Sequence, residues 1–334
     1  MKRFISVFMC LILLFLFSCT EDGGHGETST DRIESLNGPK TTVRVASLKG
    51  PTSIGMVKLM KDNEDGKTAN VYDFTVAGSA DEIVPGLIKG EYDIAAIPAN
   101  LACNLWNRTG GKVKILAVNT LCVLYIVSKG TEVSSVSDLK GKTVYATGKG
   151  STPEYCLVHV LESNGLAVGK DVTVEWKSEP AEIVSLLSSS GGVAMLPEPY
   201  VSAARSKVEG LEVKLSMNDE WKKIPSSGTF ITGVFVVRKD FAEKHPDEVA
   251  SFASEASASA GFVNTNVEEA SVLSEKYSIV NSGIAKTAIP NCNIVYTDGE
   301  EMKQSLGLFF GTLYSISPES IGGKLPDMTL YYDK

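Results

Sequence analysis

The stretch LKGPTSIGMVKL (residues 48–59) is matched one hundred residues later by GKGSTPEYCLVHVL (148–161). Both carry Lys-Gly-x-Thr, at 49–52 and at 149–152, and each time the motif separates a strand-like apolar run from a helix-like segment. Glycine allows close backbone approach, and threonine offers a hydroxyl group. A motif repeated in the same local context indicates that the chain contains two similar halves.

A second pair of matching stretches supports the repeat. DEIVPGLIKGEYDIAAIPAN (81–100) and AEIVSLLSSSGGVAMLPEP (181–199) both contain Glu-Ile-Val, a helical continuation, a break, a short apolar strand and a proline. The Glu-Ile-Val offset is again one hundred residues, and Pro98 aligns with Pro197 after a one-residue deletion. Each half then reads strand, loop, helix, strand, helix, strand, which predicts an α/β fold with a mainly parallel sheet flanked by helices.

Two apolar segments are predicted to cross between the halves, at 112–130 and 228–241. They divide the chain into lobe 1, residues 40–124 plus 233–334, and lobe 2, residues 125–232, with a ligand cleft between them. Three helices are expected after the second crossing. The last of them has an apolar stripe formed by Met302, Leu306, Phe309 and Leu313.

The N-terminus has the pattern of an export signal. Met-Lys-Arg precedes an apolar run from Phe4 to Phe17, which is shorter than the roughly 17–25 residues of a membrane-spanning helix. The run ends at Cys19 in a sequence that resembles the bacterial lipobox. Residues 1–19 are therefore predicted to be a lipoprotein signal peptide with Cys19 lipidated, and residues 20–39 a flexible polar tether.

Charge and composition exclude several classes of function. A net charge of −8 without a basic cluster disfavours a nucleic-acid partner. Cys103, Cys122, Cys156 and Cys292 are too widely spaced for a CxxC motif, and whether they are free or paired is left open. The three histidines show no metal-ligand spacing. No cofactor and no metal are expected.

The candidate site follows from the predicted sheets. In parallel α/β sheets, ligands bind beyond the carboxyl ends of the strands, where the Lys-Gly-x-Thr loops are expected. Exposed N–H groups at helix N-termini favour negative charge. Two facing loops, one in each lobe, would therefore hold a small anionic ligand from both sides. The alternative is that Thr52 and Thr152 only cap their helices.

Further candidates lie at the other strand ends, and each has a structural alternative. Glu198 would need a hydrogen-bond donor on the ligand, or else it caps a helix or supports the hinge. Asn119 and Thr229 flank the crossings, and Asn119 could instead satisfy backbone there. Four aromatic residues could stack on a ring or simply pack: Trp106, Tyr155, Tyr200 and Phe230. The predicted ligand-binding residues are Gly50, Pro51, Thr52, Ser53, Pro98, Ala99, Asn100, Asn119, Gly150, Ser151, Thr152, Glu198 and Thr229.

The mature chain resembles the periplasmic-binding-protein-like lipoproteins of nitrate, sulfonate, taurine and thiamine-precursor ABC importers. The resemblance rests on LKGPTSIGMVKLM, DIAAIPANLA, AVNTLCVLYIV, GKTVYATGKGSTPEY, VAMLPEP and SIGGKLPDMTLYY. It implies the type II two-lobed fold, which closes on its ligand by hinge motion, and it places around the cleft the loops at Gly50–Ser53, Pro98–Asn100, Gly150–Thr152 and Glu198. Ser53-Ile54 departs from the glycine-rich continuation typical of the family.

The resemblance implies a substrate-binding lipoprotein of an ABC importer that captures a small anionic or zwitterionic solute. Its partners would be the permease and ATPase subunits, with the membrane contacted through the N-terminal lipid, and the protein is expected to be a monomer. It would be lipid-anchored on the outer face of the cytoplasmic membrane or in the periplasm of a bacterium. Two alternatives are an enzyme on the same fold, of thiamine-pyrimidine or menaquinone-pathway type, and a ligand sensor without transport.

Overall fold

The computed structural model describes residues 40–333, which belong to one compact unit. The predicted signal peptide, the lipidation site Cys19 and the tether at 20–39 lie outside the described residues. Within 40–333, none of the helices combines the length and the apolar character that crossing a bilayer requires.

The first repeat forms the predicted alternation of strands and helices. Its elements are β1 (Thr42–Leu48), α2 (Pro51–Ile54), α3 (Val57–Glu64), β2 (Val71–Ala77), α4 (Ala80–Lys89), β3 (Ile94–Pro98) and α5 (Ala99–Thr109). One difference from the sequence prediction is local. The helix expected through Ile54 and Val57 is broken at Gly55 and Met56, where α2 ends after one turn and α3 begins.

The second repeat follows the same order. Its elements are β6 (Thr143–Ala146), α6 (Thr152–Ser163), β7 (Thr173–Trp176), α7 (Pro180–Ser190), β8 (Gly192–Pro197) and α8 (Tyr200–Lys207). Here the helix after the Lys-Gly-x-Thr loop is continuous, and Pro153 lies in its first turn, where proline is well tolerated. The two repeats therefore share their order of elements but differ in the helix that follows the loop.

The repeated Glu-Ile-Val has a structural explanation. Glu82 accepts a hydrogen bond from the backbone N of Ser79 (2.9 Å), and Glu182 accepts one from the backbone N of Glu179 (3.1 Å). These contacts close capping boxes at the first turns of α4 and α7. The isoleucine that follows each glutamate is fully buried. The repeat at this position therefore sets helix starts and core packing.

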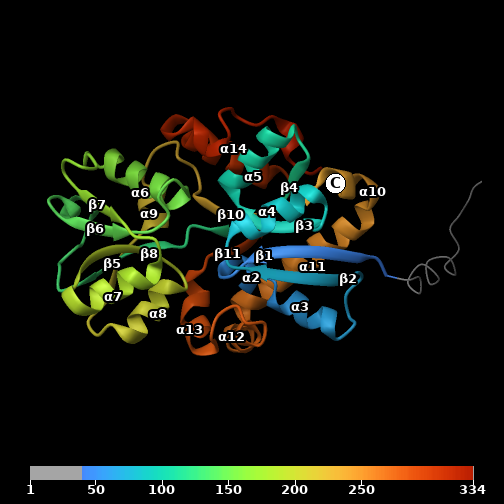
Figure 1. Cartoon of the computed structure of the whole chain (residues 1–334), viewed down its shortest axis with the longest axis horizontal. Coiled ribbons are helices and arrows are strands. Elements are labelled where there is room, and N and C mark those ends of the chain that lie inside the picture. Colours follow the sequence, from blue (N-terminus) through green and yellow to red (C-terminus); the bar gives the residue numbers. More distant parts are fainter. Residues whose placement is uncertain (1–39, 334) are drawn as a thin grey trace, which may run out of the picture. The chain divides into compact units, whose positions relative to one another are not determined.

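The strands form two sheets, which confirms the predicted two-lobed α/β fold (Figure 1). The six-stranded sheet has the order β11-β4-β10-β3-β1-β2, and the five-stranded sheet has the order β7-β6-β8-β5-β9. The remaining strands are β4 (Val113–Leu121), β5 (Leu124–Lys129), β9 (Glu212–Ser216), β10 (Ile231–Arg238) and β11 (Ile294–Thr297).

The crossing strands explain why neither sheet is purely parallel. β5 pairs antiparallel with β8 and β9, and β10 pairs antiparallel with β3 and β4. Each of them arrives from the other sheet and enters at the carboxyl end of the βαβ strands, so it must run against them. All other strands except β11 share one direction within their sheet.

The C-terminal region contains more helices than the three predicted. The helices after the second crossing are α10 (Lys239–Lys244), α11 (Pro246–Thr265), α12 (Val267–Lys276), α13 (Ser282–Ala288) and α14 (Gly299–Ile316), while α9 (Met217–Lys222) lies before it. Pro246 separates α10 from α11 because proline can start a helix but cannot continue one. The predicted apolar stripe of α14 is confirmed, since all four of its residues are fully buried.

Candidate functional site

The strand ends named by the sequence meet at one edge of the six-stranded sheet. Gly233 of β10 lies opposite Pro98 at the end of β3 and opposite Thr120 near the end of β4. A Cβ built on Gly233 would lie 3.0 Å from Cγ2 of Thr52. The loop after β1, the end of β3, the end of β4 and the start of β10 are therefore neighbours.

The first Lys-Gly-x-Thr loop is shaped by glycine and by hydroxyl groups. Gly50 has φ +117°, a conformation that residues with a side chain rarely adopt. Thr52 Oγ1 and Ser53 Oγ both donate to the carbonyl oxygen of Leu48, at 2.9 and 2.6 Å. Thr52 therefore does not cap α2 through its side chain; it ties the loop back to the end of β1.

The second loop uses its threonine differently. Gly150 again has a positive φ, +76°. Ser151 Oγ donates to the carbonyl oxygen of Gly148 (2.6 Å), and the backbone N of Gly150 donates to the carboxylate of Glu154. Thr152 Oγ1 donates to Oδ1 of Asn100 (2.7 Å). The amide that was expected to favour an anion is therefore already bonded to a carboxylate.

The Thr152–Asn100 bond joins the two sheets. Asn100 begins α5 after β3 of the six-stranded sheet, whereas Thr152 begins α6 after β6 of the five-stranded sheet. Nδ2 of Asn100 donates to the carbonyl oxygen of Ser320 (3.3 Å). In a second hydrogen bond of this kind, the hydroxyl of Tyr125 in β5 donates to the carbonyl oxygen of Asn291 (2.9 Å). Asn291 precedes β11 of the six-stranded sheet. Pro98, Ala99 and Asn100 thus lie where the two repeats touch.

Asn119 lies in an irregular part of the sheet. The pairing of β4 with β10 shifts register between Ile231 and Gly233 and again between Gly233 and Val234. Asn119 and Thr232 are the residues left out of register at these shifts. A β-bulge of this kind redirects side chains and is frequent beside functional sites. Sequence reasoning missed Thr232 and Gly233, although a glycine inside a strand pattern is a recognised signal for a bulge or a close approach.

Glu198 is bound to its own helix. The residue is 4% exposed, and its carboxylate accepts from the backbone N (3.1 Å) and from Oγ (3.0 Å) of Ser202 in α8. These two bonds are those of a helix cap, which is the structural alternative named for Glu198 above. Burial raises the pKa of Glu198, while the two bonds from Ser202 oppose this.

The raised pKa of Glu198 predicts a pH effect on stability. The folded state binds the proton on Glu198 more tightly than the unfolded chain does, so the protonated group contributes stability below the ordinary carboxyl pKa. This contribution is lost as the pH rises through the raised pKa. We expect Glu198→Gln to flatten the dependence of unfolding free energy on pH just above the ordinary carboxyl range, measured by denaturant unfolding. An unchanged pH profile would contradict the assignment.

The remaining candidates are Thr229 and the four aromatic residues. Among residues 40–333, no polar contact joins any of them to the strand ends of the six-stranded sheet described above. Thr229 precedes β10 beside Phe230, whose ring packs against Trp221 and Phe309 at centroid distances of 5.0 and 5.4 Å. Tyr200 is exposed, whereas Trp106 is buried beneath the Lys324 ammonium group. Phe230 and Trp106 are therefore packing residues. Tyr155 instead donates its hydroxyl to Gly150 O (3.3 Å) in the second loop.

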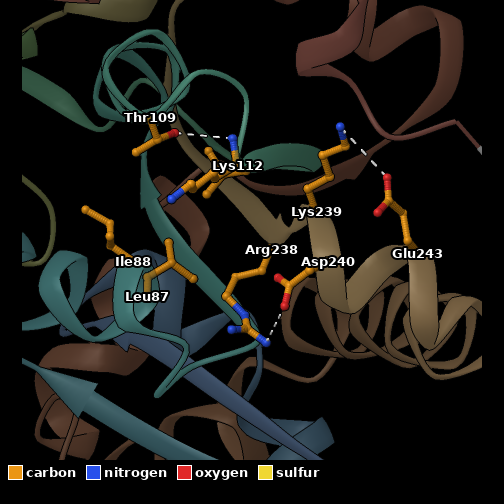
Figure 2. Close-up of a pocket in the computed structure, with 9 residues that line it drawn as sticks. Leu87, Ile88, Thr109, Lys112, Arg238, Lys239, Asp240 and Glu243 are labelled. Carbon is orange, nitrogen blue, oxygen red and sulfur yellow. Dashed lines mark hydrogen bonds and ion pairs between the residues drawn. The ribbon is translucent and has the colours of Figure 1, made fainter.

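Two cavities bear on the location of the site. One of about 270 Å³ lies between the repeats, lined by Lys49, Gly50, Pro199, Tyr200, Ala203 and residues 279–281 and 284. A larger one, about 410 Å³, lies at the opposite, amino end of β3 (Figure 2). There Arg238 and Lys239 face Asp240 and Glu243 at 3.5 and 3.9 Å. Because these charges pair with each other, the larger cavity is the weaker candidate. Residues 40–333 contain no group of three or more metal-ligating side chains.

A family model for "ABC transporter, phosphonate, periplasmic substrate-binding protein" matches residues 66–269, more than half of the chain. The chain belongs to this family. A binding protein of Brucella abortus (strain 2308) is 25% identical to this substrate-binding protein over 191 residues, covering 56% of each chain. The chain thus spans about half the length of the curated relatives it matches. By this description, members of the family are periplasmic substrate-binding proteins of ABC transporters.

Solved structures share the fold of this substrate-binding protein. An ABC transporter protein from Parabacteroides distasonis has a TM-score of 0.75 and 24% identity, covering 88% of this chain and 100% of its own. The aliphatic sulphonate binding protein SsuA from Escherichia coli has a TM-score of 0.69 and 16% identity, covering 87% and 92%. The desulfurization enzyme DszB also matches, with a TM-score of 0.59 and 10% identity, covering 87% and 98%. At these identities the likeness concerns the fold alone.

Proposed function

We propose that this substrate-binding protein captures a small anionic or zwitterionic organic solute between its two sheets and delivers it to the permease and ATPase subunits of an ABC importer. The observation that carries the proposal is the contact between the repeats. Thr152 of one sheet donates to Asn100 of the other (2.7 Å), and Gly50 lies against Pro199, with its built Cβ 3.9 Å from Cδ. A solute held at this junction touches both sheets at once.

Closure of the sheets onto the solute is the proposed mechanism. The two sheets are linked by the short segment between β4 and β5 and by the return segment before β10. A ligand shifts the balance between open and closed forms only through contacts that differ between them. The Thr152–Asn100 bond is such a contact, because it joins residues from different sheets. The boundaries proposed for the moving parts are 40–124 plus 233–334 and 125–232.

The N-terminal features complete the proposal. Export through the signal at 1–19, lipidation at Cys19 and a tether at 20–39 would hold a monomeric binding protein at the membrane surface beside its permease. This position would be the outer face of the cytoplasmic membrane or the periplasm.

Replacing Thr152 by valine tests the closing contact. Valine has the same shape but cannot donate to Oδ1 of Asn100, so the closed form loses one hydrogen bond, about 1 kcal/mol. We expect solute affinity to fall about fivefold, measured by titration calorimetry. Thr109→Val is the matched control, because its hydroxyl donates to Leu105 O (2.8 Å) within α5. Equal affinities for the two variants would contradict a closing role for Thr152.

An enzymatic alternative has one feature to support it. Nε2 of His159 lies 2.9 Å from Oγ of Ser227, a pairing that resembles part of a catalytic triad. Ser227 is, however, 3% exposed, and the imidazole packs against Trp221 at 4.8 Å between ring centroids. Burial also raises the pKa of the Cys103 thiol to about 12, and the pKa values of Cys156 and Cys292 are raised for the same reason. Protonated buried thiols are poor nucleophiles. Capture without catalysis is therefore favoured.

A panel of solutes tests the proposed function. Thermal unfolding of the purified, ligand-free protein is followed with alkanesulfonates, taurine, nitrate, bicarbonate, thiamine, aminopyrimidines and flavins. A ligand present at one hundred times its dissociation constant should stabilise the fold by about 2.7 kcal/mol. A saturating shift with one solute supports capture. A panel without any shift would count against import of these solutes, and a permease gene beside this one would separate transport from sensing.

A further inference from the structure

Buried polar atoms without a hydrogen-bond partner gather at one place in the six-stranded sheet. Four of the ten such side-chain atoms within residues 40–333 belong to Asn119, Thr120 and Thr232. They are Nδ2 and Oδ1 of Asn119 and the two threonine hydroxyl oxygens. Asn119 is 4% exposed and Thr120 is fully buried. We call these three residues the polar cluster. Because folded proteins pair nearly all buried polar atoms, such a concentration requires an explanation.

Two further observations show that the backbone around the polar cluster is irregular and closely approached by side chains. The register shifts between β4 and β10 fall on these residues, so the strands are bent locally. Gly233 lies among them, and a Cβ there would be 2.5 Å from Oδ1 of Asn119 and 3.4 Å from Cβ of Thr120. Glycine inside a strand is typical of sites of close approach. Thr52 of the first loop adjoins the same point.

The hydrogen-bonding capacity of the polar cluster is balanced. The carboxamide of Asn119 offers two N–H donors and one acceptor oxygen with two lone pairs, and each hydroxyl can donate and accept. Since neither Nδ2 nor Oδ1 has a partner, the number of free donors and acceptors is the same for both orientations of the amide. Within the described residues, no lysine or arginine forms a hydrogen bond or an ion pair with the three side chains. The polar cluster is therefore neutral.

One of the two expected anion sites is already bonded to a carboxylate, since Glu154 accepts from the backbone N of Gly150 in the second loop. In the first loop, which adjoins the polar cluster, the Thr52 hydroxyl is held by the carbonyl oxygen of Leu48 (2.9 Å). A sulfonate or carboxylate group, or a fully ionised phosphonate, accepts hydrogen bonds and cannot donate them. Such a group would leave the buried acceptor of Asn119 without a partner. A carboxamide, a ureido group or the lactam edge of a ring would pair with both the donor and the acceptor of Asn119.

We propose that the polar cluster receives an uncharged group of the solute that both donates and accepts hydrogen bonds, such as a carboxamide, ureido group or ring lactam. This inference rests on the proposed function and specifies the ligand class of the same site. Any charged group of the solute would then lie elsewhere between the sheets. Sites that pair buried donors and acceptors with a ligand discriminate strongly against analogues that lack one of them.

Matched ligand pairs test this class directly. The probes are glutamine with glutamate and asparagine with aspartate, which keep the same zwitterionic part and differ in the uncharged or anionic group, with ethanesulfonate and taurine as sulfonate references, all titrated calorimetrically into the ligand-free protein. The expected result is that at least one donor–acceptor probe binds at least tenfold more tightly than its anionic counterpart. Binding confined to sulfonates, nitrate or carboxylates would overturn the inference while leaving solute capture intact. Absence of binding by every probe and by the solute panel would overturn both.

Thr120→Val distinguishes a ligand-binding role of this hydroxyl from a purely structural role. Because the Thr120 hydroxyl has no partner, its removal should leave the melting temperature unchanged or raise it. The same change should weaken the bound donor–acceptor probe at least fivefold. Thr312→Val is the control: its hydroxyl donates to Leu308 O (3.1 Å), so its removal should lower the melting temperature without changing affinity. A Thr120→Val variant that is less stable, or that binds the probe as tightly as the parent, overturns the inference.

Discussion

Replacing Asp93 by alanine is expected to lower the free energy of unfolding by about 3 kcal/mol, the largest effect on stability that we predict. The Asp93 side chain is 2% exposed and lies between two guanidinium groups. Arg44 donates to it through Nε (2.9 Å) and Nη2 (2.6 Å), and Arg238 donates through Nη2 (3.3 Å). Removing the carboxylate leaves Arg44 without its bonded counter-ion and leaves the more buried Arg238 with only the exposed Asp240 at 3.5 Å.

The position of Asp93 explains why the loss should be large. The residue directly precedes β3, and Ile94 pairs with Val45 of β1 on one side and Val237 of β10 on the other. Its carboxylate also accepts from the backbone N of Arg44 (3.0 Å). Asp93 therefore links three neighbouring strands, including the strand that returns from the other sheet.

Asp240→Ala is the matched control for Asp93→Ala. Asp240 pairs with the same Arg238 at 3.5 Å, but its side chain is 56% exposed, so we expect a loss below about 1 kcal/mol. Urea unfolding of both variants measures the difference between their free energies of unfolding. The comparison requires that the dependence of this free energy on urea concentration is the same in both. Similar midpoints for the two variants would contradict the role assigned to Asp93.

Gly233→Ala is expected to impair solute binding more than any other single change that we predict. The new Cβ would lie 2.5 Å from Oδ1 of Asn119, which is closer than such atoms can approach, and 3.0 Å from Cγ2 of Thr52, which is a tighter contact than usual. Asn119 and the first loop must then move. We expect solute affinity to fall at least tenfold, and the free energy of unfolding to fall by about 1–3 kcal/mol from overpacking.

Gly261→Ala controls for the loss of a glycine. Gly261 lies in α11, and a Cβ there meets no atom within 4 Å, so this change should leave binding intact and favour the helix. Calorimetric titration with the solute identified in the panel, together with urea unfolding, separates the two effects. A Gly233→Ala variant that binds as tightly as Gly261→Ala would show that the start of β10 is not part of the site.

The sequence predicts the fold well because the repeat is local. Each Lys-Gly-x-Thr loop, each Glu-Ile-Val helix start and each strand ending in Pro98 or Pro197 is specified within a few residues, so the offset of one hundred exposes two copies of one pattern. The crossing strands are also visible as apolar runs. The sheet order, with β10 between β3 and β4, follows from pairing between residues more than one hundred positions apart.

The candidate site is predicted less completely. Pro98, Asn100 and Asn119 lie at or near strand ends of the six-stranded sheet, and Thr152 of the other sheet donates to Asn100, but their roles as ligand contacts stay predictions. Thr232 was missed because a bulge depends on how β10 pairs with β4, and ITGVFVVR alone reads as a regular strand. Glu198 is the opposite case, a residue that the sequence nominates for the site but whose side-chain bonds are made within the protein. Its strand-end position suggested a ligand contact, whereas its bonds go to Ser202 four residues later.

Closure of the two sheets on a solute is the central claim, and a distance measurement tests it most directly. Spin labels at Lys89→Cys in α4 and Lys170→Cys before β7 report on the two sheets, and both positions are exposed. The native cysteines Cys103, Cys122, Cys156 and Cys292 are buried, which limits unwanted labelling. With the stabilising solute added, we predict a shorter and narrower label separation, and a smaller change in Thr152→Val. A saturated protein whose distance distribution matches that of the ligand-free protein would contradict capture by closure.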